Sequence, residues 1–152
     1  MTVRAARTGD ADVLVALRAE MFAAMSHIPG GDAWKKPARE WFRDRIAHPE
    51  HGIFVVEVSG LVVACAVASI RDSAPSPAVP QGRDVLITNV CTLPEHRGRG
   101  HARAAFEAAM AWARAAGIAR AELMATPAGT GMYEKAGFRP TAYPAMRAML
   151  SR

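Results

Sequence analysis

The stretch Asn89–Ala102, which reads NVCTLPEHRGRGHA, decides the fold because it joins a strand pattern to a helix pattern through a glycine-rich turn. The run Val85–Thr92 is rich in apolar and β-branched residues and predicts a strand. From Gly100 to Ala116 the apolar residues recur at helical spacing, and Gly117 predicts the end of that helix. The apolar stripe consists of Ala105, Phe106, Ala109, Met110 and Ala113.

The turn itself has the features of an anion site. A helix N-terminus leaves backbone N–H groups unpaired and carries partial positive charge. Gly98 and Gly100 permit open dihedral angles and a close approach of a ligand, and Arg97, Arg99 and Arg103 add positive charge. This combination suits a pyrophosphate. The spacing matches neither the dinucleotide pattern G-x-G-x-x-G nor a P-loop, which requires Lys and Ser/Thr after its last glycine.

Upstream of the turn, the chain predicts three further strands and two helices. The strand patterns cover Thr2–Ala6, Ile53–Val58 and Leu61–Ile70. Ser59-Gly60 predicts a hairpin between the last two of these strands, and the proline-rich segment Ser73–Gly82 predicts a loop. The helical patterns begin at Asp10 and Asp32, with a break at Ser26–Gly31 between them.

Downstream, the patterns are shorter. Ala121–Ala125 predicts a strand and Gly131–Ala136 a short helix, while Phe138 and Met146–Leu150 are weaker strand candidates. The order β, α, α, β, β, β, α, β, α, β predicts an α+β layer fold with one mixed sheet. Without an internal repeat or a linker, residues 1–152 are expected to form a single domain.

Composition indicates an ordinary globular protein, since 51% of the residues are hydrophobic. The first ten residues lack the apolar core of a secretory signal, and no apolar stretch is long enough to span a bilayer. We therefore expect a cytoplasmic protein with no membrane partner. Cys65 and Cys91 lie inside apolar runs, which favours neither a disulfide framework nor a metal site.

The charge is basic, with 19 Lys and Arg against 14 Asp and Glu, and this favours a polyanionic partner. A nucleic-acid binder is one hypothesis. The sequence disfavours it because the arginines gather at one helix N-terminus and no aromatic residues are interleaved with them. A phosphorylated cofactor explains the same cluster.

Two motifs give this sequence a specific resemblance. Arg97-Gly98-Arg99-Gly100-His101-Ala102 matches the R/Q-x-x-G-x-G/A signature of the GNAT superfamily of acyl-CoA N-acyltransferases, and Tyr133–Phe138 resembles the Y-x-x-x-G-F motif near the end of that domain. The resemblance covers nearly the whole chain, although the first seventy or so residues match only in element order. It implies a three-layer α+β fold: a mixed, mostly antiparallel central sheet flanked by about four helices.

The resemblance also implies a cofactor, acetyl-CoA, and the residues that hold it. Val90, Cys91 and Thr92 would pair by backbone with the pantetheine arm. The pyrophosphate would lie on the N–H groups of the turn and first helical residues, with side-chain charge beside them. These residues are Arg97, Gly98, Arg99, Gly100, His101, Ala102 and Arg103. Thr126 stands where relatives often have an asparagine, and Tyr133 would be the general acid that protonates the departing CoA thiolate.

The reaction implied is direct attack of an amine on the thioester, which also requires an oxyanion donor and a base. A distorted strand near Asn89–Cys91 would supply an N–H to the developing negative charge. A Lys-like amine with a pKa of ~10.4 is almost fully protonated at pH 7, so a base or a water chain must remove its proton. Glu122, Glu20 and Asp84 are candidate bases, and none of them stands out.

The acceptor is open at this point, with a small amine, an antibiotic, an amino acid and a protein N-terminus all remaining. Trp34, Trp41 and Phe42 would line the acceptor pocket or simply pack in the core, and His27 would face the acceptor or lie exposed. His96 and His101 lack a third ligand at metal-site spacing, so we expect no metal. The function predicted is N-acetylation of a primary amine. The alternative is a non-catalytic CoA-binding regulatory module, and a homodimer is compatible with either.

Overall fold

The computed structural model describes residues 1–25 and 31–151, so His27 and most of the predicted break at Ser26–Gly31 lie outside the described residues. A five-stranded sheet in the order β1-β2-β3-β4-β5 forms the centre. Its strands are β1 (Thr2–Ala5), β2 (His51–Val58), β3 (Leu61–Asp72), β4 (Arg83–Thr92) and β5 (Ala121–Glu122). Neighbouring strands are antiparallel except β4 and β5, which are parallel.

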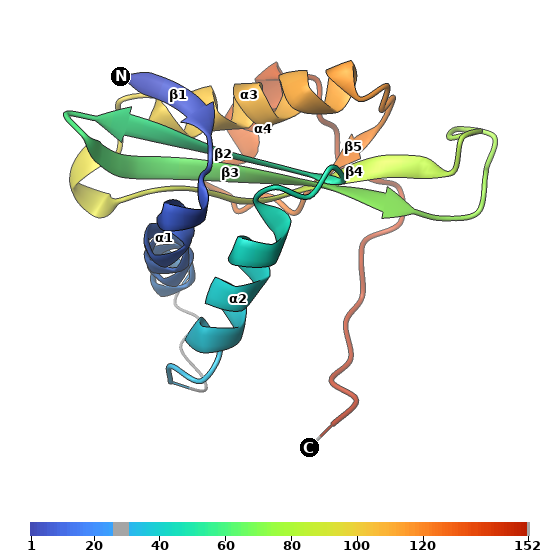
Figure 1. Cartoon of the computed structure of the whole chain (residues 1–152). Coiled ribbons are helices and arrows are strands. Elements are labelled where there is room, and N and C mark those ends of the chain that lie inside the picture. Colours follow the sequence, from blue (N-terminus) through green and yellow to red (C-terminus); the bar gives the residue numbers. More distant parts are fainter. Residues whose placement is uncertain (26–30, 152) are drawn as a thin grey trace.

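The helices form a layer on each face of this sheet (Figure 1). Within the described residues there are four: α1 (Ala11–Ala24), α2 (Lys35–Arg45), α3 (His101–Ala115) and α4 (Thr130–Lys135). One face is covered by α1 and α2, and the other by α3 and α4 (Figure 1). Short 3-10 turns at Thr8–Asp10 and Pro94–His96 lead into α1 and α3. The predicted three-layer α+β fold with a mixed, mostly antiparallel sheet is confirmed.

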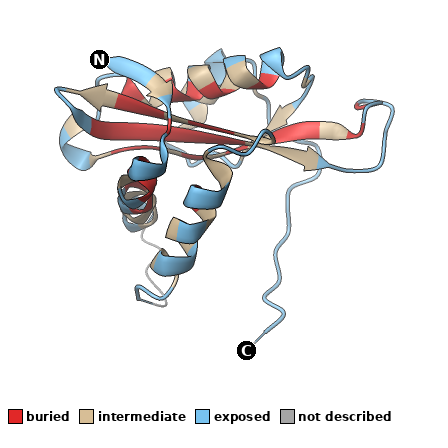
Figure 2. Ribbon diagram, in the orientation of Figure 1, coloured by how far each residue is buried: buried red, intermediate tan, exposed pale blue. Residues whose placement is uncertain are grey.

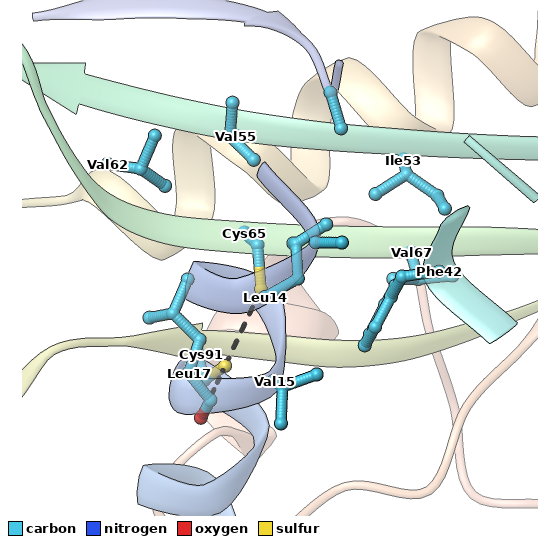
Figure 3. Packing of buried hydrophobic residues seen from close by; sticks show 12 residues of the cluster. Leu14, Val15, Leu17, Phe42, Ile53, Val55, Val62, Cys65, Val67 and Cys91 are labelled. Atoms are coloured by element: carbon cyan, nitrogen blue, oxygen red, sulfur yellow. Dashed lines mark hydrogen bonds between the residues drawn. The ribbon is translucent and has the colours of Figure 1, made fainter. Parts of the chain in front are cut away.

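The core lies in two clusters, one on each face of the sheet. Figure 3 shows the first, in which side chains of α1 and α2 pack against buried residues of β2 and β3 and against Cys91 of β4. The second lies beneath α3, where Ala105, Phe106 and Ala109 pack against the sheet. Figure 2 shows that β3 is buried along most of its length, as expected for a strand with helices on both faces.

Small residues let α3 approach the sheet closely. Ala64, Ala66 and Ala68 of β3 face this helix and are fully buried. At Gly52 a Cβ atom would come within 2.4 Å of the Trp112 ring of α3. The position of α3, and therefore of its N-terminus, depends on these small side chains.

The predicted hairpin at Ser59-Gly60 is confirmed, since both residues have positive φ and Val58 pairs with Leu61. The second helix begins at Lys35 instead of Asp32, which forms a turn and an ion pair with Lys35. Along residues 1–25 and 31–151, no helix has the length and hydropathy needed to cross a membrane.

The strands predicted at Phe138 and Met146–Leu150 are wrong. The Phe138 ring packs against Phe106 and Tyr133, and the chain beyond it runs away from the body without regular structure (Figure 1). Pro140 and Pro144 provide no N–H for a ladder. The large apolar side chains beyond, at Tyr143, Met146, Met149 and Leu150, are between 83% and 97% exposed. The strand predicted at Ala121–Ala125 is also shorter, ending at Glu122.

Candidate active site

The centre of the candidate site is a bulge in β4. The register between β3 and β4 shifts between Cys65 and Val67, so Asn89 and Val90 both lie opposite the single residue Ala66. Asn89 has φ of 57°, a left-handed conformation that asparagine tolerates better than most residues. The distortion predicted near Asn89–Cys91 is therefore present, and it interrupts the regular ladder at this point.

Two side chains hold the Asn89 amide in place. Arg18 of α1 donates from Nη1 to Asn89 Oδ1 over 3.0 Å, and Asn89 Nδ2 donates to Cys65 Sγ over 3.3 Å. The Cys65 thiol in turn donates to the Asn89 carbonyl over 3.1 Å. These contacts support a left-handed conformation that costs about 1–2 kcal/mol outside glycine.

The cysteines beside the bulge are packing residues. Cys65 and Cys91 are buried free thiols with their sulfurs 3.7 Å apart, and Figure 3 shows them beneath α1. The hydrogen bond with Cys91, together with burial, raises the pKa of the Cys65 thiol well above its ordinary value. Cys91 donates to the Leu17 carbonyl. The geometry gives Cys91 a hydrogen-bonded place in the core and no adjacent base among the described residues.

One edge of β4 is open beside the bulge. β5 pairs with β4 only at Val85 and Leu86, so the backbone from residue 87 to residue 92 has no β5 partner. Val90, Cys91 and Thr92, the predicted pantetheine residues, all lie in this part of β4. Backbone N–H and C=O groups on such an edge can pair with an extended ligand.

The glycine turn follows directly from this edge. Gly98 and Gly100 have φ of 79° and 80°, so both need the freedom of glycine. A Cβ atom at either position would meet no heavy atom within 4 Å, which leaves open space above the turn. Gly100 is the N-cap of α3, and its carbonyl accepts from Ala104 N–H. The N–H groups of the first turn of α3 are therefore presented next to this space.

The predicted arginines lie around the same turn but differ in their contacts. Arg97 Nε donates to the Thr92 carbonyl over 3.3 Å, which ties the turn back to the end of β4. Arg103 lies 3.9 Å from Glu107 in an exposed pair, and Arg99 is exposed. Together they keep the turn electropositive.

The two histidines of this region have buried ring nitrogens. His101 is buried, with its Nδ1 3.3 Å from Met1 Sδ, so only its backbone lies at the turn, and Ala102 follows it, half-buried. The buried Nδ1 of His96 has no hydrogen-bond partner among the described residues. No group of three metal-ligating side chains occurs in residues 1–25 and 31–151.

Tyr133 lies in an aromatic cluster on the α3 face. Its ring is 5.3 Å from that of Phe106 and 6.0 Å from that of Phe138. Burial raises the pKa of the Tyr133 hydroxyl above its ordinary value, so the phenol stays protonated at neutral pH. Thr126 is exposed, and its carbonyl accepts from Gly129 N–H, in the loop before α4.

A large pocket meets the bulge from the other face of the sheet. Its volume is about 950 Å³, and Asn89 lies in its wall together with side chains of α1, α2, β2 and β3. Trp34 and Trp41 line it while half-buried, whereas Phe42, at 1% exposure, belongs to the core as well. The pocket and the open edge of β4 therefore meet at the same residue.

Two pocket residues, Arg18 and His51, were missed by sequence reasoning. Arg18 is one of many arginines in the chain, and His51 stands at the start of a strand with no motif around it. His51 Nδ1 lies 2.9 Å from Ser69 Oγ, and burial lowers the pKa of its imidazole, which keeps it neutral at pH 7. No local pattern marks either residue.

The predicted bases lie elsewhere. Asp84 opens β4 at the end away from the bulge, where it is buried and bound by Arg71 and Arg120 over 2.7 and 3.0 Å. Glu122 lies within 3.4 and 3.7 Å of the same two arginines. Glu20 is half-buried on α1. The Asp84 and Glu122 carboxylates thus belong to an ion-pair cluster at the start of β4, away from Asn89.

This cluster gives a stability prediction. The hydrogen bonds from Arg71, with further support from Arg120, lower the pKa of Asp84. We expect Asp84→Asn to lower the free energy of unfolding by about 1–3 kcal/mol at pH 7, because two arginines lose a buried partner. Because the folded pKa is lowered, this contribution is fully present above the unfolded pKa of about 4 and is lost progressively as the pH falls from there through the folded pKa.

Urea unfolding of both proteins between pH 3 and pH 8 tests this. The difference between the free energies of unfolding of the two proteins should shrink toward acid pH. A difference independent of pH would mean that the charge of Asp84 contributes nothing.

The family profile described as the Acetyltransferase (GNAT) family matches residues 17–138. The chain belongs to the acetyltransferase (GNAT) family. The resemblance identified from the two motifs is confirmed, and the chain is an acetyltransferase by family. The sequence matches none of the curated proteins with which it was compared.

Solved structures agree over almost the whole chain. A predicted acetyltransferase from Clostridium acetobutylicum, determined with acetyl-CoA, is 25% identical with a TM-score of 0.87, covering 98% of this chain and 96% of its own. A GCN5-related N-acetyltransferase from Ralstonia eutropha is 28% identical with a TM-score of 0.82, covering 97% of both chains. Glucosamine-6-phosphate N-acetyltransferase from Arabidopsis thaliana, at 17% identity and a TM-score of 0.75, covers 97% of both and shares the fold.

Proposed function

We propose that this GNAT acetyltransferase transfers the acetyl group of acetyl-CoA to a primary amine by direct attack, without a covalent enzyme intermediate. The observation that carries the proposal is the continuity of the open, bulged edge of β4 with the glycine turn at the N-terminus of α3. An extended ligand with a phosphorylated end fits such a track. The similar protein from Clostridium acetobutylicum was determined with acetyl-CoA, which supports the same cosubstrate here.

The turn would bind the pyrophosphate. Backbone N–H groups from Gly98 to Arg103 would donate to it, and the positive end of the α3 dipole would stabilise its charge. The open space above Gly98 and Gly100 fits a bulky phosphate. Arg97 and Arg99 add positive charge, and His101 and Ala102 contribute only backbone in this arrangement.

The open edge of β4 would bind the pantetheine arm. Val90, Cys91 and Thr92 offer backbone groups that β5 leaves without a strand partner. The Cys91 side chain is turned into the core, where it donates to Leu17, so its backbone alone would take part. Thr126 would offer a hydroxyl from the loop before α4 in place of the amide common in relatives.

The chemistry then takes place at the bulge. As the amine nitrogen bonds to the thioester carbon, negative charge develops on the carbonyl oxygen, and a bulge N–H near Val90 would stabilise it. When the carbon–sulfur bond breaks, Tyr133 would donate its hydroxyl proton to the CoA sulfur. The proton that the nitrogen loses after attack would restore the phenol through water. The ammonium proton of the acceptor would leave through water in the pocket, since Asp84 and Glu122 are bound to arginines.

Ligand-induced stabilisation tests the cosubstrate. A ligand that binds only the folded state at 100 times its Kd adds about 2.7 kcal/mol, which raises Tm by about 5–10 °C for a chain of this size. We expect CoA and acetyl-CoA to produce such a shift at millimolar concentration, and NAD and ATP to produce much less. An equal increase in Tm with ATP, or no increase with acetyl-CoA, would contradict the proposal.

Turnover separates this proposal from the alternative, a CoA-binding regulatory module. An amine panel at saturating acetyl-CoA, followed by mass spectrometry of the acetylated products, should show at least one product. Strong CoA binding with no product across small amines, amino acids and peptides would favour the regulatory module.

A further inference from the structure

The pocket beside Asn89 is larger than an amino group requires, and part of its wall is aromatic. Four aromatic side chains, from Phe22 of α1, Trp34 just before α2, and Trp41 and Phe42 of α2, contribute to its wall. Its volume of about 950 Å³ lies at the upper end of the range for drug-sized ligands. The aromatic wall favours a flat apolar group attached to the amine.

Among the described residues that line this pocket, one cation has no anionic partner. Asp32 and Lys35 pair with each other over 2.9 Å, and the lowered pKa of His51 keeps that ring neutral at pH 7. Arg18 has no carboxylate within ion-pair distance among the described residues. Its guanidinium lies 4.8 Å from the centre of the Phe22 ring. The lining therefore carries a net positive charge that an anionic group would neutralise.

Arg18 also fixes where that anionic group would lie. Nη1 donates to Asn89 Oδ1 over 3.0 Å, while the guanidinium has five N–H donors in a planar fork. The remaining donors are thus held within a few ångströms of the bulge where the amine would react. Burial lowers the pKa of the Arg18 guanidinium, because desolvation disfavours its charged form. A carboxylate bound there would lie close to the reacting amine, as the carboxylate of an α-amino acid does.

The end of the pocket away from Arg18 and Asn89 is also polar. His51 and Ser69 pair across β2 and β3, and Ser69 pairs in turn with Leu86, three residues before Asn89. Three strand residues span about 10 Å. A side chain extending from the bulge along the aromatic wall would point toward this polar pair.

We propose that the acceptor is an α-amino acid with an aromatic side chain, whose carboxylate binds Arg18 while its ring lies against Trp34 and Trp41. This inference rests on the proposed function, because it assigns the acceptor of the same reaction. A carbon–nitrogen bond would form while the thioester carbon–sulfur bond breaks, and the products would be an N-acetyl amino acid and free CoA.

Matched pairs of acceptors that differ only in the carboxylate provide the test. Phenylalanine, tyrosine and tryptophan would be compared with phenethylamine, tyramine and tryptamine, and alanine would serve as an acid without a ring. We expect kcat/KM to be about 30-fold higher for each aromatic acid than for its amine, the range of a charge-assisted hydrogen-bonded contact. Alanine should be poorer than the aromatic acids.

Arg18→Gln is the diagnostic variant, because glutamine can still donate to Asn89 Oδ1 but carries no charge. In this variant, the ratio of kcat/KM for each aromatic acid to kcat/KM for its matched amine should fall to about 1. This ratio is insensitive to a general loss of activity. Lys35→Gln is the matched control. It removes a pocket cation that is already paired with Asp32, so it should keep the preference for acids.

The outcomes separate this inference from the proposed function. Acetylation of the amines at least as fast as the acids would overturn the amino-acid assignment while leaving the acetyltransferase reaction intact. The same holds if Arg18→Gln keeps the preference for acids. Absence of acetyl-CoA binding and of any product would instead overturn the proposed function.

Discussion

Gly100→Glu is expected to weaken CoA binding at least 100-fold while changing the fold little. Gly100 has φ of 80° and caps the N-terminus of α3. A glutamate there would place a carboxylate beside the proposed pyrophosphate. Two like charges about 5 Å apart at an effective dielectric constant of about 20 repel by about 3 kcal/mol, or roughly 100-fold in Kd.

The cost in stability should be smaller. A Cβ at Gly100 would meet no heavy atom within 4 Å, so the substitution meets no clash in the protein itself. The left-handed conformation costs a non-glycine residue about 1–2 kcal/mol. We therefore expect a modest decrease in Tm together with a large loss of CoA affinity.

Two alanine variants separate backbone strain from charge. Gly117, at the other end of α3, has the same φ of 80° and equally open space. Gly117→Ala should cost stability without affecting CoA binding, and Gly100→Ala should fall between wild type and Gly100→Glu in affinity. Calorimetric titration with CoA measures all of them. If Gly100→Glu binds CoA as tightly as wild type, the pyrophosphate lies elsewhere.

The parts of this molecule that were predictable from sequence are those with local causes. The glycine turn and α3 follow from left-handed glycines and a helical repeat within about one helix length, and Ser59-Gly60 forms its hairpin from two residues alone. The motifs at 97–102 and 133–138 then indicated the family, which supplied the layer order that patterns alone could not.

The parts that escaped prediction depend on contacts between distant segments. Arg18 bonds to Asn89 across 71 positions of sequence, and the carboxylate of Asp84 is bound by arginines from β3 and from the loop before β5. No spacing rule reveals such pairs. The strand predicted at Met146–Leu150 failed for a related reason, because an apolar segment becomes a strand only when a neighbouring edge pairs with it.

Tyr133→Phe is expected to lower kcat by about 10- to 100-fold. If Tyr133 protonates the departing sulfur, the variant must release CoA as a thiolate. A thiol with a pKa of about 8.5 is a fair leaving group, so the effect should lie at or below the low end of the ~10²–10⁴ range for general acids. The raised pKa of the Tyr133 hydroxyl keeps the donor protonated across the neutral range, which suits this role.

Tyr133→Phe isolates the role of the hydroxyl because it removes that group and keeps the ring. The ring would keep its contacts with Phe106 and Phe138, at centroid distances of 5.3 and 6.0 Å. Folding and CoA affinity should therefore stay close to wild type, with the loss confined to kcat. Tyr143, which is 90% exposed, offers a control, and Tyr143→Phe should leave kcat, KM and Tm unchanged.

The competing interpretation is that Tyr133 only packs its ring between α3 and the end of the chain. That interpretation predicts full activity for Tyr133→Phe and a loss of stability for Tyr133→Ala, because the aromatic cluster with Phe106 would be broken. Steady-state kinetics on an accepted amine, paired with CoA titration of each variant, distinguishes the two. An unchanged kcat in folded Tyr133→Phe would leave the CoA thiolate to depart unassisted or with a proton from water.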